Sequence, residues 1–208
     1  MLAEAKQKYK VQIEVAGPTA MWARPDTGSA VISERIPSWS ASKGMFEAIA
    51  RLKSAYIHPT RVEICRPIQI HRYATNYNGP LRKSSQIRGG DPFQLPAVVL
   101  VDVCYRLYGD VREASPAPTS TNHLHALQEM FNRRLQKGQC FRPVCLGWSE
   151  FVASYCGPFR EGTQIESSIN LTVPSMLYSV FNRPVSGTVA PVFVQGAEIR
   201  NGVLEYAH

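Results

Sequence analysis

The sequence contains no apolar run long enough to cross a membrane, and its first residues, Met1–Lys8, lack the apolar segment of a secretory signal peptide. Its five cysteines are an odd number, and no two of them form a Cys-x-x-Cys pair. This pattern argues against a disulfide framework and against a zinc site. We therefore expect a cytoplasmic protein with no membrane partner, no metal and no cofactor, whose cysteines serve as small apolar residues.

Acidic residues are scarce in the middle of the chain. Residues 51–90 contain eight Lys and Arg but a single acid, Glu63, so this segment accounts for the whole net charge of +7. A basic stretch is most often a solvated face, and it fits a surface that holds a phosphate backbone about as well. The apolar content of 44% indicates a folded domain, and a pI of about 9.3 favours a polyanionic partner.

Apolar alternation and helical periodicity predict strand, helix, strand, strand, helix, strand. The expected elements are a strand over 9–15, a helix that begins after Ser38 or Ser40, strands over 61–66 and 68–72 divided by Pro67, a strand over 96–108, a helix over 122–137 and an interrupted strand over 140–151. Residues 74–94 show no periodicity and predict a long loop.

This order is typical of the ferredoxin-like or RNA-recognition-motif fold, in which two split βαβ units build one antiparallel sheet with both helices behind it. The remaining residues contain short β-type runs over 169–173, 191–194 and 197–206, with Asn201-Gly202 as a hairpin turn. We therefore predict an α+β protein with a ferredoxin-like RNA-binding domain over residues 1–151 and a β-rich extension over residues 152–208. Such sheets commonly bind RNA, although a fold alone does not set a function.

The end of the second helix combines cations with a glycine. Arg133, Arg134 and Lys137 lie on its last turns, and Gly138 follows them. A glycine allows the backbone to come close to a ligand, and the flanking charges favour a phosphate as that ligand.

Four blocks of the sequence resemble the CRISPR-associated Cas family five. The spacing of Val15–Pro25, Pro37–Ile49 and Ile64–Ile68 is that of the family, and Glu129–Phe141 followed by Cys145–Phe151 is similar to its subtype d, of type I-C systems. The resemblance covers residues 9–151. It implies a ferredoxin-like protein that holds the 5′ end of the guide RNA in a type I interference complex, beside the large and backbone subunits.

Many subtype d members also cut the repeat RNA without a metal. Members that cut resemble one another in a Tyr near the end of the first helix and a Lys-His pair at the start of the second. In this sequence Ala50 and Ala126-Leu127 stand at those positions.

His123 and His125, at the opening of the same helix, are our candidate catalytic residues. A helix N-terminus disfavours a charged imidazole, so a histidine there can serve as a base, and it also offers N–H groups to a phosphate. The alternative is that both are surface or capping residues, and residues two apart point in different directions on a helix. Tyr56 is a candidate to replace the missing aromatic residue.

A further set of residues is predicted to bind RNA through phosphate contacts and base stacking. For the phosphates we select Arg24, Lys43, Arg82, Lys83, Arg88, Arg133, Arg134 and Lys137, with Gly138 as a point of close approach, and for stacking Trp22. The alternative for each is ordinary: Trp22 belongs to the core, and the arginines pair with carboxylates.

These observations predict a CRISPR antiviral defence protein that binds repeat or guide RNA and processes precursor CRISPR RNA by metal-independent endonucleolytic cleavage. It would remain on its product as the 5′-handle subunit of a type I-C interference complex. The alternative is a non-catalytic guide-RNA-capping and assembly subunit, with cleavage by another nuclease. The missing Tyr and Lys-His favour the alternative, whereas the subtype d resemblance favours the nuclease. A third hypothesis, binding of double-stranded DNA, depends on charge alone.

Overall fold

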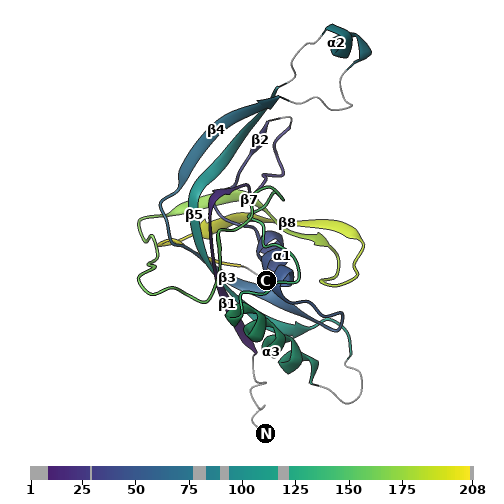
Figure 1. Ribbon diagram of the computed structural model, residues 1–208, viewed down its shortest axis with the longest axis vertical. Helices are drawn as coiled ribbons and strands as arrows, with labels where there is room; N and C mark the ends of the chain where they lie inside the picture. The colour runs from purple at the N-terminus through teal and green to yellow at the C-terminus, as the bar shows by residue number, and fades with distance from the viewer. Residues whose placement is uncertain (1–8, 29, 77–82, 90–93, 117–121, 207–208) are drawn as a thin grey trace.

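The computed structural model describes residues 9–28, 30–76, 83–89, 94–116 and 122–206, and shows a mixed α/β protein that is mostly sheet (Figure 1). Two long helices and one short helix accompany the strands within these residues. In chain order the elements are β1 (Lys10–Ala20), β2 (Val31–Ile32), α1 (Trp39–Ile49), β3 (Ala55–Ile64), β4 (Gln69–Asn76), α2 (Ser84–Gly89), β5 (Gln94–Glu113), α3 (His123–Gln136), β6 (Tyr155–Gly157), β7 (Leu171–Phe181), β8 (Val189–Ile199) and β9 (Val203–Glu205).

The long strand β5 organises the main sheet. The strand order is β6-β1-β5-β3-β9, and β2 and β4 also pair with β5. On one side β5 pairs with β1, and on the other it pairs first with β4 and then with β3. Asp102 lies between these two stretches with a left-handed backbone, φ 50°. The β4–β5 pair therefore leaves the body of the protein as a projecting arm, with α2 at its far end (Figure 1).

Both long helices begin where the sequence predicts and pack on one core. The Ser38 side chain accepts a hydrogen bond from the Ala41 N–H at 3.2 Å and caps α1. Apolar side chains of α1 and α3 meet at Phe46 and Phe131, whose rings lie 5.7 Å apart. They pack with Ile13 and other buried residues of β1, β3 and β5 in a continuous core.

Two regions differ from the sequence prediction. Residues 140–151 do not form the predicted strand. Their β-pairing is limited to a single bridge between Cys145 and Val152, and the chain turns at Gly147, which has φ 99°. Val144 and Leu146 enter the core from this irregular segment, which explains its apolar pattern. The predicted loop over 74–94 is shorter, since β4 continues to Asn76 and α2 lies inside it; residues 77–82 and 90–93 lie outside the described part.

The last quarter of the chain is β-rich, as predicted. β7 and β8 form a separate two-stranded antiparallel sheet, and a turn at Asn201 and Gly202 (φ 51° and 76°) joins β8 to β9. β6 and β9 belong to the main sheet, where they pair with β1 and β3. The Tyr206 hydroxyl is buried and donates to the Pro37 carbonyl at 2.8 Å. The chain end is thereby attached to the segment that leads into α1.

Candidate nucleic-acid interface

The two candidate catalytic histidines occupy different environments at the start of α3. The Asn122 side chain caps the helix by accepting a hydrogen bond from the His125 N–H at 3.1 Å, and its amide donates to the Tyr9 hydroxyl at 2.7 Å. His125 is exposed, and its ring lies 6.0 Å from that of Tyr9. His123 is buried, and its Nδ1 makes no hydrogen bond with the described residues. The structure thus brings His125, Tyr9 and Asn122 together at the surface and directs His123 into the protein.

The side of α3 that carries His125 continues along the start of β1. Gln128, three residues after His125, donates from its side-chain amide to the Lys10 carbonyl at 2.9 Å. Asn132 follows one turn later on the same side. This strand segment has no further strand beyond it, because β6 pairs with β1 only over residues 14–16 in the described part. The row of polar side chains therefore borders the edge of the sheet.

At the other end of α3, structural and exposed cations lie side by side. Arg134 donates to the Ile49 carbonyl at 2.7 Å and so holds the last turn of α1. Gly138, at φ 63°, ends α3, and the next N–H, of Gln139, bonds back to the Arg134 carbonyl at 2.8 Å. Arg133 and Lys137 are exposed. Arg134 and Gly138 thus have structural roles at the end of the helix, whereas Arg133 and Lys137 are available to a phosphate.

Trp22, Arg24 and Lys43 are engaged within the protein. The Trp22 ring is 4% exposed, and its Nε1 donates to the Tyr105 hydroxyl at 3.2 Å. Arg24 forms a two-bond pair with Asp26, with its closest distance at 2.6 Å. Lys43 forms an ion pair with Glu47 one turn along α1. In this conformation Trp22 therefore has no open ring face for a base, and both cations have carboxylate partners.

The arm carries its own exposed basic residues. Lys83 and Arg88 are exposed at the two ends of α2, and Arg82 lies outside the described residues. Arg72 is exposed on β4, next to a stacked pair of His71 and Tyr73 with ring centroids 6.2 Å apart. The later part of the basic segment thus lies on the arm, away from the core, whereas Arg61 lies on β3.

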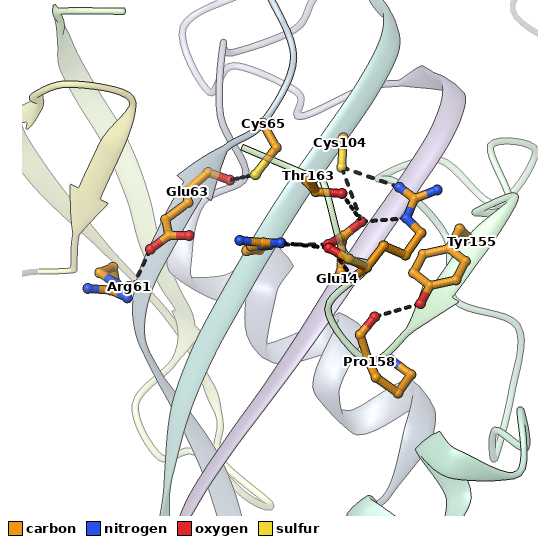
Figure 2. Close-up of polar contacts among 10 residues, drawn as sticks. Glu14, Arg61, Glu63, Cys65, Cys104, Tyr155, Pro158 and Thr163 are labelled. Atoms are coloured by element: carbon orange, nitrogen blue, oxygen red, sulfur yellow. Dashed lines mark hydrogen bonds and ion pairs between the residues drawn. The ribbon is translucent and has the colours of Figure 1, made fainter. Parts of the chain in front are cut away.

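An ion cluster that the sequence did not predict lies on the sheet face opposite α1 and α3 (Figure 2). Glu14 of β1 is fully buried and accepts hydrogen bonds from Arg106 of β5 at 3.2 Å, from the Arg160 side chain at 2.6 Å and from Thr163 at 3.0 Å. Burial acts to raise the pKa of Glu14, but these hydrogen bonds, led by that of Arg160, outweigh it and hold the pKa below its ordinary value. Glu14 is therefore an ionised anchor.

The same arginines fasten a loop over part of that face. Arg106 also donates to the Arg160 carbonyl at 3.0 Å and lies 4.6 Å above the Phe159 ring, while Arg160 lies 4.2 Å above Tyr155. Residues 158–163 therefore cover the sheet around Glu14. The alternation of polar residues in β1 is visible in the sequence, but no local signal links Glu14 to residues about ninety and more positions away.

The described residues offer no group of three or more His, Cys, Asp and Glu side chains that could hold a metal ion. In that same part of the chain, none of the helices is both long and apolar enough to span a membrane.

Comparison with known proteins identifies relatives over almost the whole chain, although no protein-family model matches it. The sequence is 30% identical to the CRISPR pre-crRNA endoribonuclease Cas5d of Thermus thermophilus, over 94% of this chain and 90% of the relative. It is 25% identical to the protein of the same name from Mannheimia succiniciproducens, over 94% of each chain.

Solved structures show the same fold. A CRISPR-associated protein superposes with a TM-score of 0.67 at 19% identity, over 96% of this chain and 92% of its own. A functionally uncharacterized protein from Streptococcus mutans superposes with a TM-score of 0.66 at 15% identity, over the same shares of the two chains. With 30% identity across 94% of its length to a Cas5d protein, this chain belongs to the Cas5d family of CRISPR-associated proteins.

Proposed function

We propose that this protein is an endoribonuclease that cleaves precursor CRISPR RNA without a metal ion. The observation that carries the proposal is the 30% identity, over 94% of the chain, to a relative named as a CRISPR pre-crRNA endoribonuclease. We further propose that the protein stays on its product as the 5′-handle subunit of a type I-C interference complex. Its exposed basic arm supports contact with RNA, and the exposed apolar side chains of the β7–β8 sheet, Phe181, Val189, Val192 and Phe193, support contact with other subunits.

The sheet order supports a ferredoxin-like core. Along β6-β1-β5-β3 all neighbours are antiparallel, α1 connects β1 to β3, and α3 connects β5 to β6. This is the order of two split βαβ units. We propose residues 1–151 as the RNA-recognition-motif domain and residues 152–208 as its extension. Two strands of the main sheet, β6 and β9, come from the extension.

The chemistry we propose uses the RNA's own 2′-hydroxyl as the nucleophile. The exposed His125 imidazole accepts the 2′-hydroxyl proton, and the first-turn N–H groups of α3 face the phosphate that is attacked. The 2′-oxygen bonds to phosphorus as the bond from phosphorus to the 5′-oxygen breaks, and the Tyr9 hydroxyl, held by Asn122, gives its proton to the leaving 5′-oxygen. Buried His123 positions the helix start and does not touch the RNA.

Two substitutions test this assignment. In EDTA, His125→Ala is expected to slow cleavage of the cognate repeat RNA by about 100-fold or more, because a general base is lost, without changing RNA affinity. His123→Ala is expected to lower the melting temperature and to leave a folded fraction that cuts normally. Single-turnover cleavage, RNA binding and thermal unfolding are measured on the same preparations. Cleavage by His125→Ala at the wild-type rate would overturn the assignment.

A second candidate function is a non-catalytic cap on the guide RNA. It is favoured by the residues at the family's catalytic positions: Ala50 is buried at the end of α1, and Leu127 is buried in the core, 1% exposed. Intact RNA that stays tightly bound to the wild-type protein in EDTA would support the cap and exclude the nuclease.

A further inference from the structure

Three neighbouring strands place polar side chains in register on the sheet face opposite α1 and α3. Lys10 and Gln12 of β1 stand opposite Asp110 and Tyr108 of β5, and Arg61 of β3 also stands opposite Tyr108. The intervening residues of these strands, Val11, Ile13, Leu107 and Val111, are buried in the core. Since side chains alternate between the two faces of a strand, the polar set shares the opposite face.

The polar set surrounds a hollow of about 750 Å³ that is open to solvent. This size lies in the range of roughly 300–1,000 Å³ that is usual for ligand sites. Its lining comprises Lys10, Gln12, Thr60, Arg61, Tyr108, Asp110, Arg112, Asn132 and Glu205, with Val11 and Gly109. The loop over residues 158–163, which the Glu14 cluster holds, borders the hollow, since Phe159 packs edge-on against Tyr108 with ring centroids 5.3 Å apart. The loop thus covers the face around Glu14, and the hollow lies open next to it.

The cations of the hollow differ in what they already contact. Arg61 pairs with Glu63 at 2.9 Å and lies 3.9 Å above the Tyr108 ring, so it forms part of the wall. Within the described part of the chain, Lys10 and Arg112 form no ion pair with an acid, and Asp110 forms no ion pair with a cation. Both cations are carried by strands of the main sheet, whose backbone is held by ladders on β5. The hollow therefore presents two cations, at backbone positions that the sheet fixes, beside an acceptor.

The hollow reaches around the open edge of β1 to α3 and is thereby continuous with the proposed cleavage position. Lys10 follows Tyr9 directly, and the α3 row that begins at His125 reaches it, because Gln128 donates to the Lys10 carbonyl and Asn132 lines the hollow. From His125 to Asn132 the helix rises about 10 Å. A short piece of RNA can span that length while one phosphate stays beside His125.

We propose that this hollow binds the single-stranded RNA that flanks the cleaved phosphate, an inference that rests on the proposed RNA-processing function. Lys10 and Arg112 hold its phosphates, and Gln12, Asp110 and Asn132 bind base edges or ribose hydroxyls. A carboxylate and two amides suit a ligand that offers hydrogen-bond donors, which a nucleotide does and an inorganic phosphate at neutral pH does not. The hollow thus selects the nucleotides next to the cut.

The test compares two double variants that remove the same charge. Lys10→Ala/Arg112→Ala is the test, and Arg183→Ala/Arg200→Ala, two exposed cations outside the main sheet near the β7–β8 sheet, is the control. Affinity for the single-stranded repeat RNA is measured by fluorescence anisotropy over a range of salt concentrations. We expect the test variant to bind at least about tenfold more weakly and its salt slope to fall by about 1.4, because each single-strand phosphate contact contributes about 0.7. The control is expected to keep both values.

The outcomes separate the inference from the function on which it rests. If the wild-type protein binds no repeat RNA, the proposed function fails. If it binds, and the test variant matches the control in affinity and slope, the hollow is not an RNA site and the function stands. Should the test variant melt below the wild type, crosslinking of 4-thiouridine RNA to the wild-type protein replaces it. Crosslinks in β1 and β5 support the inference, and crosslinks confined to other elements overturn it.

Discussion

The polar side chains of this protein fall into two groups: buried ones that stabilise the fold and exposed ones that are accessible to a ligand. Glu14 and His123 are buried, whereas His125 and Lys10 are exposed, although all four are polar residues on the same few elements. The sequence indicated where helix α3 begins and that two histidines mark it. It could not tell which histidine faces solvent, because that depends on how the helix is rotated against the sheet, a tertiary property.

Glu14→Gln tests the buried anchor. The substitution leaves Arg106 and Arg160 without their carboxylate, and we expect the free energy of unfolding to fall by about 3 kcal/mol at neutral pH, or less because Arg160 is partly exposed. Urea denaturation measures the change. Glu198→Gln, which removes an exposed carboxylate that pairs with Arg200, serves as the control and is expected to change little.

The same anchor predicts an acid dependence. The pKa of Glu14 in the folded protein lies below its ordinary value of 4.5, so its stabilisation is complete above that pH and is lost as the pH falls through the folded-state pKa. The difference in unfolding free energy between wild type and Glu14→Gln should therefore narrow below about pH 4.5. A difference that stays constant down to the acid transition would show that Glu14 is not an ionised anchor.

Among the elements, the two long helices were the most predictable and the segment after α3 the least. Ser38 and Asn122 are standard capping residues, and the apolar spacing of α1 and α3 is that of amphipathic helices. Residues 140–151 have strand-like composition, but Pro143 and Gly147 interrupt them, and their apolar side chains fill the core without a strand partner. Composition cannot distinguish these two uses of the same residues.

The end of α3 allows a matched glycine test at the scale of an element. Gly138 has φ 63°, and a Cβ added there would meet nothing within 4 Å, so Gly138→Ala should lower the free energy of unfolding by about 1 kcal/mol through backbone strain alone. Gly44 lies within α1 and is equally open, so Gly44→Ala should raise it by up to about 1 kcal/mol. Chemical denaturation compares the two. Equal signs would contradict the assignment of Gly138 as a structural helix end.

Across the whole molecule, the last quarter of the chain is joined to the elements that precede it by strand pairing and burial. β6 and β9 complete the main sheet, and Tyr206 is buried against the start of α1. The order of elements in the sequence predicted a mixed α/β protein that is mostly sheet, but the pairings of β9 with β3 and of β5 with four partners depend on contacts between distant residues. The hollow on the sheet face was missed for the same reason, since its lining comes from four strands and a helix.

Tyr206→Phe tests how firmly this extension is attached. The substitution removes the buried hydroxyl that bonds Pro37 and Ser42, at 2.8 and 2.7 Å, and leaves the ring in place. We expect the free energy of unfolding to fall by about 1–3 kcal/mol, because the Ser42 hydroxyl and the Pro37 carbonyl would be left buried without this partner. A lower melting temperature, with RNA affinity unchanged after refolding in the cold, is the expected result. An unchanged melting temperature would show that the extension is held by other contacts.

The central claim is cleavage of precursor CRISPR RNA by this chain, without a metal and through the RNA's own 2′-hydroxyl. The most direct measurement incubates the wild-type protein in EDTA with its repeat RNA and with the same RNA carrying a single 2′-deoxynucleotide before the cut, and analyses the product ends by mass spectrometry. We expect a single cut that leaves a 2′,3′-cyclic phosphate, and a deoxy-substituted RNA that is bound but intact. Repeat RNA that stays whole in EDTA, or a deoxy-substituted RNA that is still cut, would contradict the account.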